Sequence, residues 1–315
     1  MSLRLTVGIC AYNEEKNIGH LLTSILVEQH LPLDAEVLVV CSGCTDNTVK
    51  IVQEYACNDS RINMCLESER YGKASAMNII LANAKGDLII FLSADTLPQK
   101  DCFNNLTSKL KNPRVGLVCG KPLPVNDSNN LSDTLVKFMW QSHDYIFKNL
   151  CKAGIARHAS EVFCVRAGIV KKIPMEIIND DAFIALTVKK KGWIVNYDSN
   201  SRVSICGPKT LSEYFTQRRR VLIGHWQIKK STGDSPQHLL YLLPIYPLKV
   251  ARLILGLCEE QGLPAFAIFV LIEFLIDLST IPSRIRNKPT NKWSVLSSTK
   301  EVIEPNIDRK HLVPQ

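Results

Sequence analysis

The first hundred residues alternate between short β-rich runs and segments with helical spacing, and this alternation is the strongest constraint on the fold. Between the first two runs, segment 14–29 places its apolar residues three and four positions apart, as one face of a helix does. Strands that alternate with helices predict a wound, mostly parallel α/β sheet flanked by helices. Ligands of such sheets bind at the carboxyl ends of the strands. The predicted strands are residues 3–11, 35–41, 61–66 and 87–94. The predicted helices follow the first three of these strands in turn and are residues 14–29, 46–57 and 73–84.

The alternation continues less regularly as far as residue 205, and the chain then changes character. A basic amphipathic helix is predicted at 211–230, followed by apolar stretches at 238–257 and 263–282. We therefore expect a catalytic domain at 1–228, with halves 1–98 and 99–228, and membrane-associated helices with a polar tail at 229–315. The middle of the chain predicts a strand at 116–121, a helix at 135–150, an apolar element at 161–170 and a helix at 180–192.

The charge of the chain is concentrated in its last third. The net charge is +8; residues 1–205 contribute 23 − 21 = +2 and residues 206–315 contribute 15 − 9 = +6. A basic excess of this kind fits a membrane surface, a nucleic acid or a phosphate-bearing ligand. The apolar helices beside it favour the membrane, and we expect no nucleic-acid partner. Hydrophobic residues make up 46% of the chain, which excludes a disordered protein.

Two cysteines in the sequence Cys41-Ser-Gly-Cys44 follow the second predicted strand. A CxxC pair at a strand-to-helix junction is typical of a thioredoxin-like redox site, and it also supplies two of the four ligands of a structural zinc site. The chain opens MSLRLTVGICAYNEE, without the basic and apolar regions of a secretory leader, so we expect reduced thiols. A thiol or zinc module remains a distant alternative.

Four motifs occur in a set order along the chain. They are ICAYNEEKNI (9–18), VVCSGCTDNT (39–48), RYGKASAMN to FLSADTLP (70–98) and INDDAF to QRRRVLIGH (178–225). Together they resemble the motifs of family 2 glycosyltransferases of the GT-A fold. The resemblance covers roughly residues 4–228 and depends on the order and spacing of the set. It implies an inverting enzyme that moves one sugar from a nucleoside-diphosphate sugar to an acceptor.

The resemblance implies that the loops after the first two strands bind the nucleotide. Tyr12 and Glu14 are the candidates in the first loop, where Asn13 alternatively caps the next helix. In the second loop the family usually has an aspartate that contacts the base, at or beside the position of Cys41. Ser42 or Asp46 would then take over that contact.

The third motif implies contacts with the sugar diphosphate. Gly72 lets the backbone approach the ligand, Lys73 offers a charge to phosphate, and Asn78 belongs to the same segment. Asp95 matches the last aspartate of the family's D-x-D motif, which holds Mn²⁺ or Mg²⁺, whereas Ser93 replaces the first. We therefore expect a divalent cation that is held by Asp95 and largely by the substrate's phosphates.

The fourth motif implies the catalytic groups. Asp181 is the expected general base, and Asp180 beside it would raise the pKa of the pair. Alternatively, both acids simply stabilise the start of a helix. Arg220 is expected on the diphosphate, and Gln217 and Arg219 near the acceptor.

Other features of this motif bear on the acceptor and the metal. Val221 stands where processive synthases have a tryptophan, which favours the addition of one sugar. The motif is also a basic helix face that can contact lipid headgroups. His143, His158 and His225 lie near these segments and could supplement Asp95 at the metal.

The two apolar stretches are each about long enough to cross a bilayer, but each carries two charges. A hairpin would pair Lys249 and Arg252 with Glu273 and Asp277; helices lying on the surface and a soluble helical subdomain are the other possibilities. Basic flanks favour the cytoplasmic face of a membrane. We therefore expect a lipid-linked or membrane-proximal acceptor, either a glycan or a polyprenyl-linked one. Departures at Cys41, Ser93 and Val221 leave a non-catalytic sugar-nucleotide-binding scaffold as the main alternative.

Overall fold

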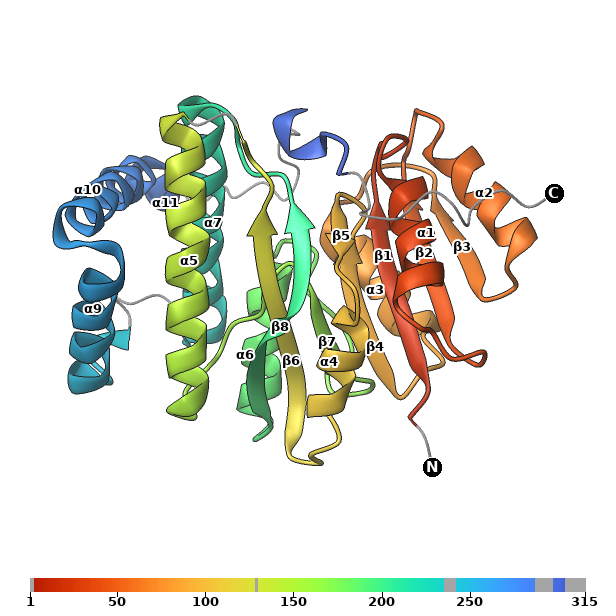
Figure 1. The fold of residues 1–315 in the computed structure, drawn as a ribbon, viewed down its shortest axis with the longest axis horizontal. Helices are drawn as coiled ribbons and strands as arrows, with labels where there is room; N and C mark the ends of the chain where they lie inside the picture. The colour runs from red at the N-terminus through yellow and green to blue at the C-terminus, as the bar shows by residue number, and fades with distance from the viewer. Residues whose placement is uncertain (1–2, 128–129, 235–241, 287–296, 304–315) are drawn as a thin grey trace.

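The computed structural model describes residues 3–127, 130–234, 242–286 and 297–303. Its centre is one eight-stranded sheet with helices on both faces (Figure 1). The strands are β1 (Leu5–Ala11), β2 (Glu36–Ser42), β3 (Ile62–Glu67), β4 (Leu88–Ser93), β5 (Thr96–Pro98), β6 (Val115–Pro124), β7 (Phe163–Arg166) and β8 (Ile194–Ile205). Their order is β3-β2-β1-β4-β7-β6-β8-β5, so strands of the second half of the catalytic region extend the sheet of the first.

The helices follow the predicted alternation in the first half of the chain, and the mixed α/β fold with C-terminal apolar helices is confirmed. Bounds differ from the predicted ones by a few residues at most ends. The helices are α1 (Ile18–Glu28), α2 (Thr48–Asn58), α3 (Lys73–Asn83), α4 (Cys102–Lys109), α5 (Leu131–Lys152), α6 (Asp180–Lys190), α7 (Leu211–Thr232), α9 (Pro247–Gln261), α10 (Leu263–Ser279), α11 (Ile281–Arg286) and the 3₁₀ turn η1 (Ser297–Lys300).

Strand register places the ligand loops at one edge of the sheet. β1 pairs in parallel with β2 and β4, with Ala11 opposite Cys41 and Cys10 opposite Ser93. β7 runs antiparallel to β4 and β6, and β8 runs parallel to β6. The loops that leave β1, β2 and β4 therefore open side by side.

Two layers of apolar side chains hold the sheet between the helices. Along β4, Ile89 and Phe91 belong to the cluster on the α3 face, whereas Ile90 and Leu92 belong to the cluster on the α1 face. This alternation is that of a strand covered on both faces, which explains why β4 is apolar throughout. Burial of each such side chain contributes about 1.5–3 kcal/mol, so the edge that carries the ligand loops is rigidly supported.

Strand β8 was not predicted, nor were β5 and α4, because their sequences lack strong periodicity. β8 contains the polar run Asn196–Ser201, which is typical of a loop. The structure accommodates it because the register with β6 is irregular there and the Ser201 hydroxyl donates to Asp198 at 2.7 Å. The apolar element predicted at 161–170 proves to be a short strand, β7.

The C-terminal helices lie outside a layer formed by α5 and α7 (Figure 1). Phe138 of α5 packs against Phe269 of α10 with ring centroids 4.7 Å apart. Arg218 of α7 forms an ion pair with Glu273 of α10 at 2.7 Å, and the Tyr214 hydroxyl donates to the same carboxylate. α10 is thus attached to the catalytic region by one face.

The predicted charge pairing between α9 and α10 is wrong for three of its residues, of which Glu273 pairs with Arg218 of α7. Asp277 pairs with Arg284 of α11, and the Lys249 amine donates to the Ala153 carbonyl at 3.4 Å. Glu273 and Asp277 of α10 are thus paired with cations of α7 and α11, so their charges do not require a hairpin with α9. The start of the first apolar stretch, 238–241, lies outside the described residues.

Candidate active site

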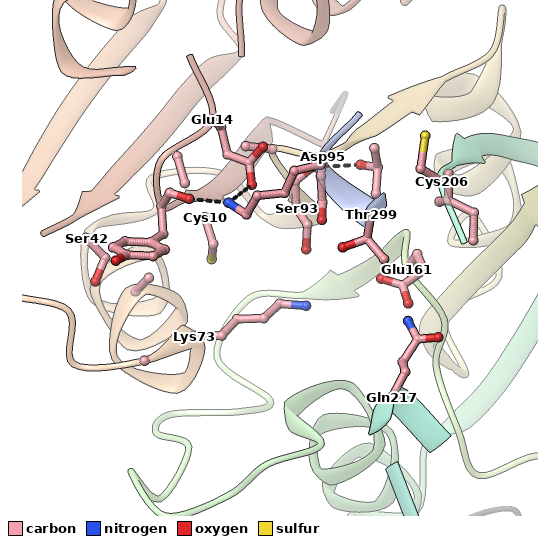
Figure 2. A pocket seen from close by; sticks show the side chains of 18 of the residues that line it. Cys10, Glu14, Ser42, Lys73, Ser93, Asp95, Glu161, Cys206, Gln217 and Thr299 are labelled. Carbon is pink, nitrogen blue, oxygen red and sulfur yellow. Dashed lines mark hydrogen bonds and ion pairs between the residues drawn. The ribbon is translucent and has the colours of Figure 1, made fainter. Parts of the chain in front are cut away.

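A pocket of about 260 Å³ lies at the carboxyl edge of the sheet, where the loops after β1, β2 and β4 meet α7 (Figure 2). Eight of the sequence-predicted residues line it: Tyr12, Glu14, Ser42, Gly72, Lys73, Asp95, Gln217 and Arg220. Asp46, Asn78, Arg219 and the Asp180–Asp181 pair are not among the lining residues.

The first loop forms one wall of the pocket. The Arg70 guanidinium lies over the Tyr12 ring at 4.3 Å, and the Glu14 N–H donates to the Thr48 hydroxyl at 2.7 Å. Burial and the nearby Asp95 raise the pKa of Glu14 to about 7. This wall therefore offers an aromatic ring and a carboxyl group that gains or loses its proton near neutral pH.

The CSGC loop contributes its serine to the pocket, while Asp46 turns away. The Asp46 carboxylate accepts the N–H groups of Thr48 and Glu15 at 3.0 and 3.1 Å, which ties the start of α2 to the first loop. Cys41 is buried, and Cys44 lies near the Ala11 carbonyl at 3.6 Å. All eleven cysteines are free, and the described residues hold no group of three or more His, Cys, Asp or Glu suited to a metal.

Gly72 and Lys73 begin α3 at the floor of the pocket. Gly72 has a φ of +100°, a conformation that side chains disfavour, so a glycine is needed to direct the chain into the helix. The Lys73 amine lies 3.6 Å from the Asp180 carboxylate. Burial lowers the pKa of Lys73, but the Asp180 and Glu161 carboxylates outweigh it and raise that pKa overall. Asn78, one turn on, instead joins α3 to the backbone of Ile173 through two hydrogen bonds.

Asp95 follows β4 and enters the pocket beside Ser93 (Figure 2). A carboxylate and a hydroxyl are oxygen donors of the type that Mn²⁺ and Mg²⁺ accept. They are too few for a protein-only site, so the donor set fits a cation that is completed by substrate phosphates.

Asp180 and Asp181 form the first turn of α6, just behind the pocket. The Asp180 carboxylate is buried, and burial followed by the neighbouring Asp181 raises its pKa. Asp181 lies 3.8 Å from the His158 ring, which contacts His225 at 3.4 Å. Asp181 acts electrostatically on Lys73 and Glu161, both in the pocket wall. His158 and His225 thus lie beside the predicted base.

The third predicted histidine, His143, is half-buried and packs against Trp140 and Phe147 of the same helix. Its ring stacks on Phe147 with centroids 3.9 Å apart, and burial lowers its pKa to about 3. A ring that stays neutral and is enclosed by aromatic side chains has a structural role. The sequence alone could not separate this histidine from the two beside Asp181.

Helix α7 presents Gln217 and Arg220 to the pocket and Arg219 to the opposite side, where it donates to the Ser279 carbonyl at 3.2 Å. The carbonyl of Val221 accepts the Asn179 amide at 2.9 Å. A Cβ on Gly224 would come within 2.5 Å of the Asn179 side chain, so this glycine allows α7 to approach the segment that carries the two aspartates.

Sequence reasoning missed several lining residues. Arg70 is the first residue of the third motif, where only the residues after it were considered, and Glu161 begins a run that is notable in the sequence only for its apolar character. Thr299 and Lys300 lie in the polar tail beyond the apolar helices, where nothing in the sequence marks them. The missed residues of the lining include Arg70, Trp140, Glu161, Cys206, Gly207, Thr299 and Lys300.

Replacing Glu161 with glutamine is expected to stabilise the free protein at high pH. Burial raises the pKa of Glu161 from 4.5 to about 6, so the folded state binds its proton more tightly than the unfolded state. The ionised carboxylate then costs stability above pH 6, and this cost disappears below the unfolded value of 4.5. Melting temperatures should be higher for the variant at about pH 8 and equal to wild type near pH 4. Glu54→Gln, an exposed change on α2, is the control; a gain independent of pH would contradict the assignment.

The comparison with protein families decides the class of the pocket. The model described as "Glycosyl transferase family 2" matches residues 6–173, more than half of the 315 residues. The chain belongs to glycosyl transferase family 2. It is therefore a glycosyltransferase, as the motifs predicted, and the pocket lies where the matched region meets α7.

Curated relatives of this glycosyltransferase include polymer synthases. The poly-beta-1,6-N-acetyl-D-glucosamine synthase of Staphylococcus aureus (strain COL) is 24% identical over 248 residues, which cover 76% of this chain and 60% of the relative. The Staphylococcus epidermidis synthase is 25% identical over 244 residues, 75% of this chain and 58% of the relative. The match thus spans less than two thirds of these relatives.

Solved structures share the fold of this glycosyltransferase. The mannosyltransferase PcManGT from Pyrobaculum calidifontis, in complex with GDP-Man and Mn²⁺, has a TM-score of 0.61 and 24% identity, covering 91% of this chain and 83% of its own. S. aureus TarS in complex with UDP-GlcNAc has a TM-score of 0.52 and 14% identity, covering 90% and 92%. Identities this low show a common fold only.

Proposed function

We propose that this glycosyltransferase moves one sugar, with inversion, from a nucleoside-diphosphate sugar to a lipid-linked or membrane-proximal glycan. The observation that carries the proposal is the convergence of separate segments on one pocket. Tyr12, Glu14 and Asp95 enter it from the sheet edge, and Arg220 from α7, with Asp181 just behind. Fold neighbours solved with GDP-Man and UDP-GlcNAc support a nucleotide-sugar donor.

In the proposed reaction Asp181 accepts the proton of the acceptor hydroxyl as its oxygen attacks C1 of the sugar. The bond from C1 to the diphosphate oxygen breaks on the opposite face, and the nucleoside diphosphate leaves. Lys73 and Arg220 neutralise its developing charge. A divalent cation held by Asp95 would add Lewis-acid stabilisation of the same leaving group.

The transfer of a single sugar is proposed from the fourth motif. Position 221 is a valine, so an aliphatic side chain follows Arg220 on α7. The ring that supports a growing polymer in processive synthases is therefore replaced at this position. The polymer-forming activity named for the curated relatives is not proposed for this chain.

The test of this function is a transfer assay with purified protein. Labelled UDP-GlcNAc and GDP-mannose would be supplied with Mn²⁺ and a membrane lipid extract or short oligosaccharides. We expect label to pass from one donor to the lipid or glycan fraction. A folded protein that binds a nucleotide but neither transfers nor hydrolyses its sugar would instead support the scaffold, which the departures at Cys41, Ser93 and Val221 favour.

We also propose that α9–α11 lie on the cytoplasmic surface of a membrane. The run Leu263–Arg286 is long and apolar enough to span a bilayer; an 18-residue window within it has a mean hydropathy of 2.0, and 11% of that window is buried. One face of α10 is fixed to α7, whereas the other exposes large apolar side chains, an arrangement suited to the interface. Lys229, Lys230 and Arg286 supply charges that anionic lipids attract.

Removing apolar contacts from α10 should release the protein from vesicles. Leu271, Phe274 and Leu278 expose 57%, 53% and 43% of their areas. Changing all three to asparagine is expected to weaken binding to vesicles of neutral and anionic phospholipid by at least about tenfold, measured by co-sedimentation. Leu33→Asn, at a residue that is 94% exposed on the β2 side of the sheet, is the control. Equal binding by the triple variant would contradict the surface assignment.

A further inference from the structure

Residues 298–303, here called the C-terminal strap, return from the apolar helices to the ligand edge of the sheet (Figure 1). The strap is attached to the second half of the catalytic region. The Ser298 hydroxyl donates to the Glu213 carboxylate at 2.7 Å, and Glu301 pairs with Lys209. The Glu301 carbonyl also lies near the Cys206 thiol at 3.6 Å. These contacts fix the position of the strap beside α7.

The other side of the strap is bound to the first loop by Lys300. Its ammonium donates to the carbonyls of Tyr12 and Asn13, the latter at 3.1 Å, and to the Glu14 carboxylate. The Lys300 carbonyl accepts the Asn17 amide at 3.1 Å. An ammonium group has three N–H donors, and the three oxygens account for all of them. Lys300 thus holds the loop and has no donor left for a phosphate.

The positive charge of Lys300 offsets the repulsion between two carboxylates at that loop. Glu14 is only 6% exposed and lies close enough to Asp95 for the two carboxylates to repel each other. The Lys300 ammonium bonded to the Glu14 carboxylate offsets this repulsion and fixes the direction of the carboxylate. The same amine is 5.5 Å from the centre of the Tyr12 ring, so it also limits the position of the ring.

We propose that Lys300 is a positioning residue of the donor site, which fixes the Tyr12–Glu14 loop in the form that receives the nucleotide; this rests on the proposed function of the pocket. The C-terminal strap is accordingly a third wall of the site, contributed by chain that follows the membrane-associated helices. Lys300 acts through the loop, so its loss should affect the donor and spare the acceptor.

The test is Lys300→Met in the full chain, titrated with UDP and with GDP in the presence of Mn²⁺ by calorimetry. Losing hydrogen bonds from a charged group predicts binding weaker by about tenfold for the nucleotide that wild type prefers. The donor KM should rise by a similar factor, with kcat and the acceptor KM changed less than about twofold. Lys50→Met is the matched control, because it removes an exposed lysine of α2 that does not line the pocket.

A double-mutant cycle separates positioning from general loosening. If Lys300 acts partly through Glu14, Lys300→Met should weaken binding less in the Glu14→Gln background than in wild type, because only its bonds to the Tyr12 and Asn13 carbonyls are then left to lose. Ser298→Ala, which frees the strap without touching the loop, should show a smaller effect in the same direction and covers the case that Lys300→Met misfolds.

Other results would overturn the inference. Unchanged or tighter nucleotide binding by Lys300→Met would show that the strap does not support the site, or that it obstructs it. A wild-type protein that binds neither UDP nor GDP would overturn the proposed function first, and this inference with it. The two failures are distinguishable, because only the second appears before any substitution is made.

Discussion

Asp181→Asn is expected to lower kcat for sugar transfer by about a thousandfold, the middle of the range for loss of a general base. The asparagine keeps the size of the side chain but cannot accept the acceptor's proton. Asp181 is not among the residues that line the donor pocket. Nucleotide affinity is therefore expected to stay within about twofold of wild type. Single-turnover transfer and calorimetry on the same preparation would measure both quantities.

Glu161 is the alternative base that this experiment can reveal. Its carboxyl group lies in the pocket wall, and burial raises its pKa to about 6, which suits proton transfer near neutral pH. Activity retained by Asp181→Asn and lost by Glu161→Gln would transfer the role to Glu161. Asp181 would then be a residue that stabilises the start of α6.

Asp95→Asn should abolish metal-dependent binding of the donor. Changes in the outer shell of a metal site commonly cost 10–100-fold in affinity, so removing the single carboxylate expected at the cation should cost at least about 100-fold. Calorimetric titration with UDP-GlcNAc and GDP-mannose, with Mn²⁺ and with a chelator, would measure the loss. The variant is expected to bind the donor equally weakly under both conditions.

Asp87→Asn is a matched control for this result. Asp87 precedes the same strand, β4, at the opposite end, where its carboxylate accepts the Arg4 N–H at 2.9 Å. The change removes the same charge from the same strand without altering the pocket. Metal-dependent binding that survives in Asp95→Asn would show that the cation is held elsewhere.

The first half of the fold could be predicted because its strands are buried on both faces. Runs such as β4 are apolar throughout, and the helices between them carry regular apolar stripes, so sequence periodicity and structure agree. β8 could not be predicted, because it takes its place through pairing with β6 and carries a polar run. The hydrogen bond between Ser201 and Asp198 stabilises this part of β8, whereas the burial of apolar side chains stabilises the other strands.

The site was predictable to the extent that its residues follow strand ends or carry a family motif. Asp95 and Tyr12 are marked by strands that end beside them, and Arg220 by its motif. Asn78 and Arg219 have the right residue type, but helix rotation directs them to Ile173 and Ser279. Lys300 is close to Glu14 only in the folded chain, so no local pattern could reveal it.

Helix α7 carries adjacent residues toward two different environments. Gln217 and Arg220 face the reaction pocket, while Arg218 and Arg219 bind the helix that we place on the lipid surface. With α10 on the bilayer, helix α7 would set the distance between the transferred sugar and the lipid plane. The enzyme would then select acceptors by the distance of their hydroxyl group from the membrane as well as by their chemistry.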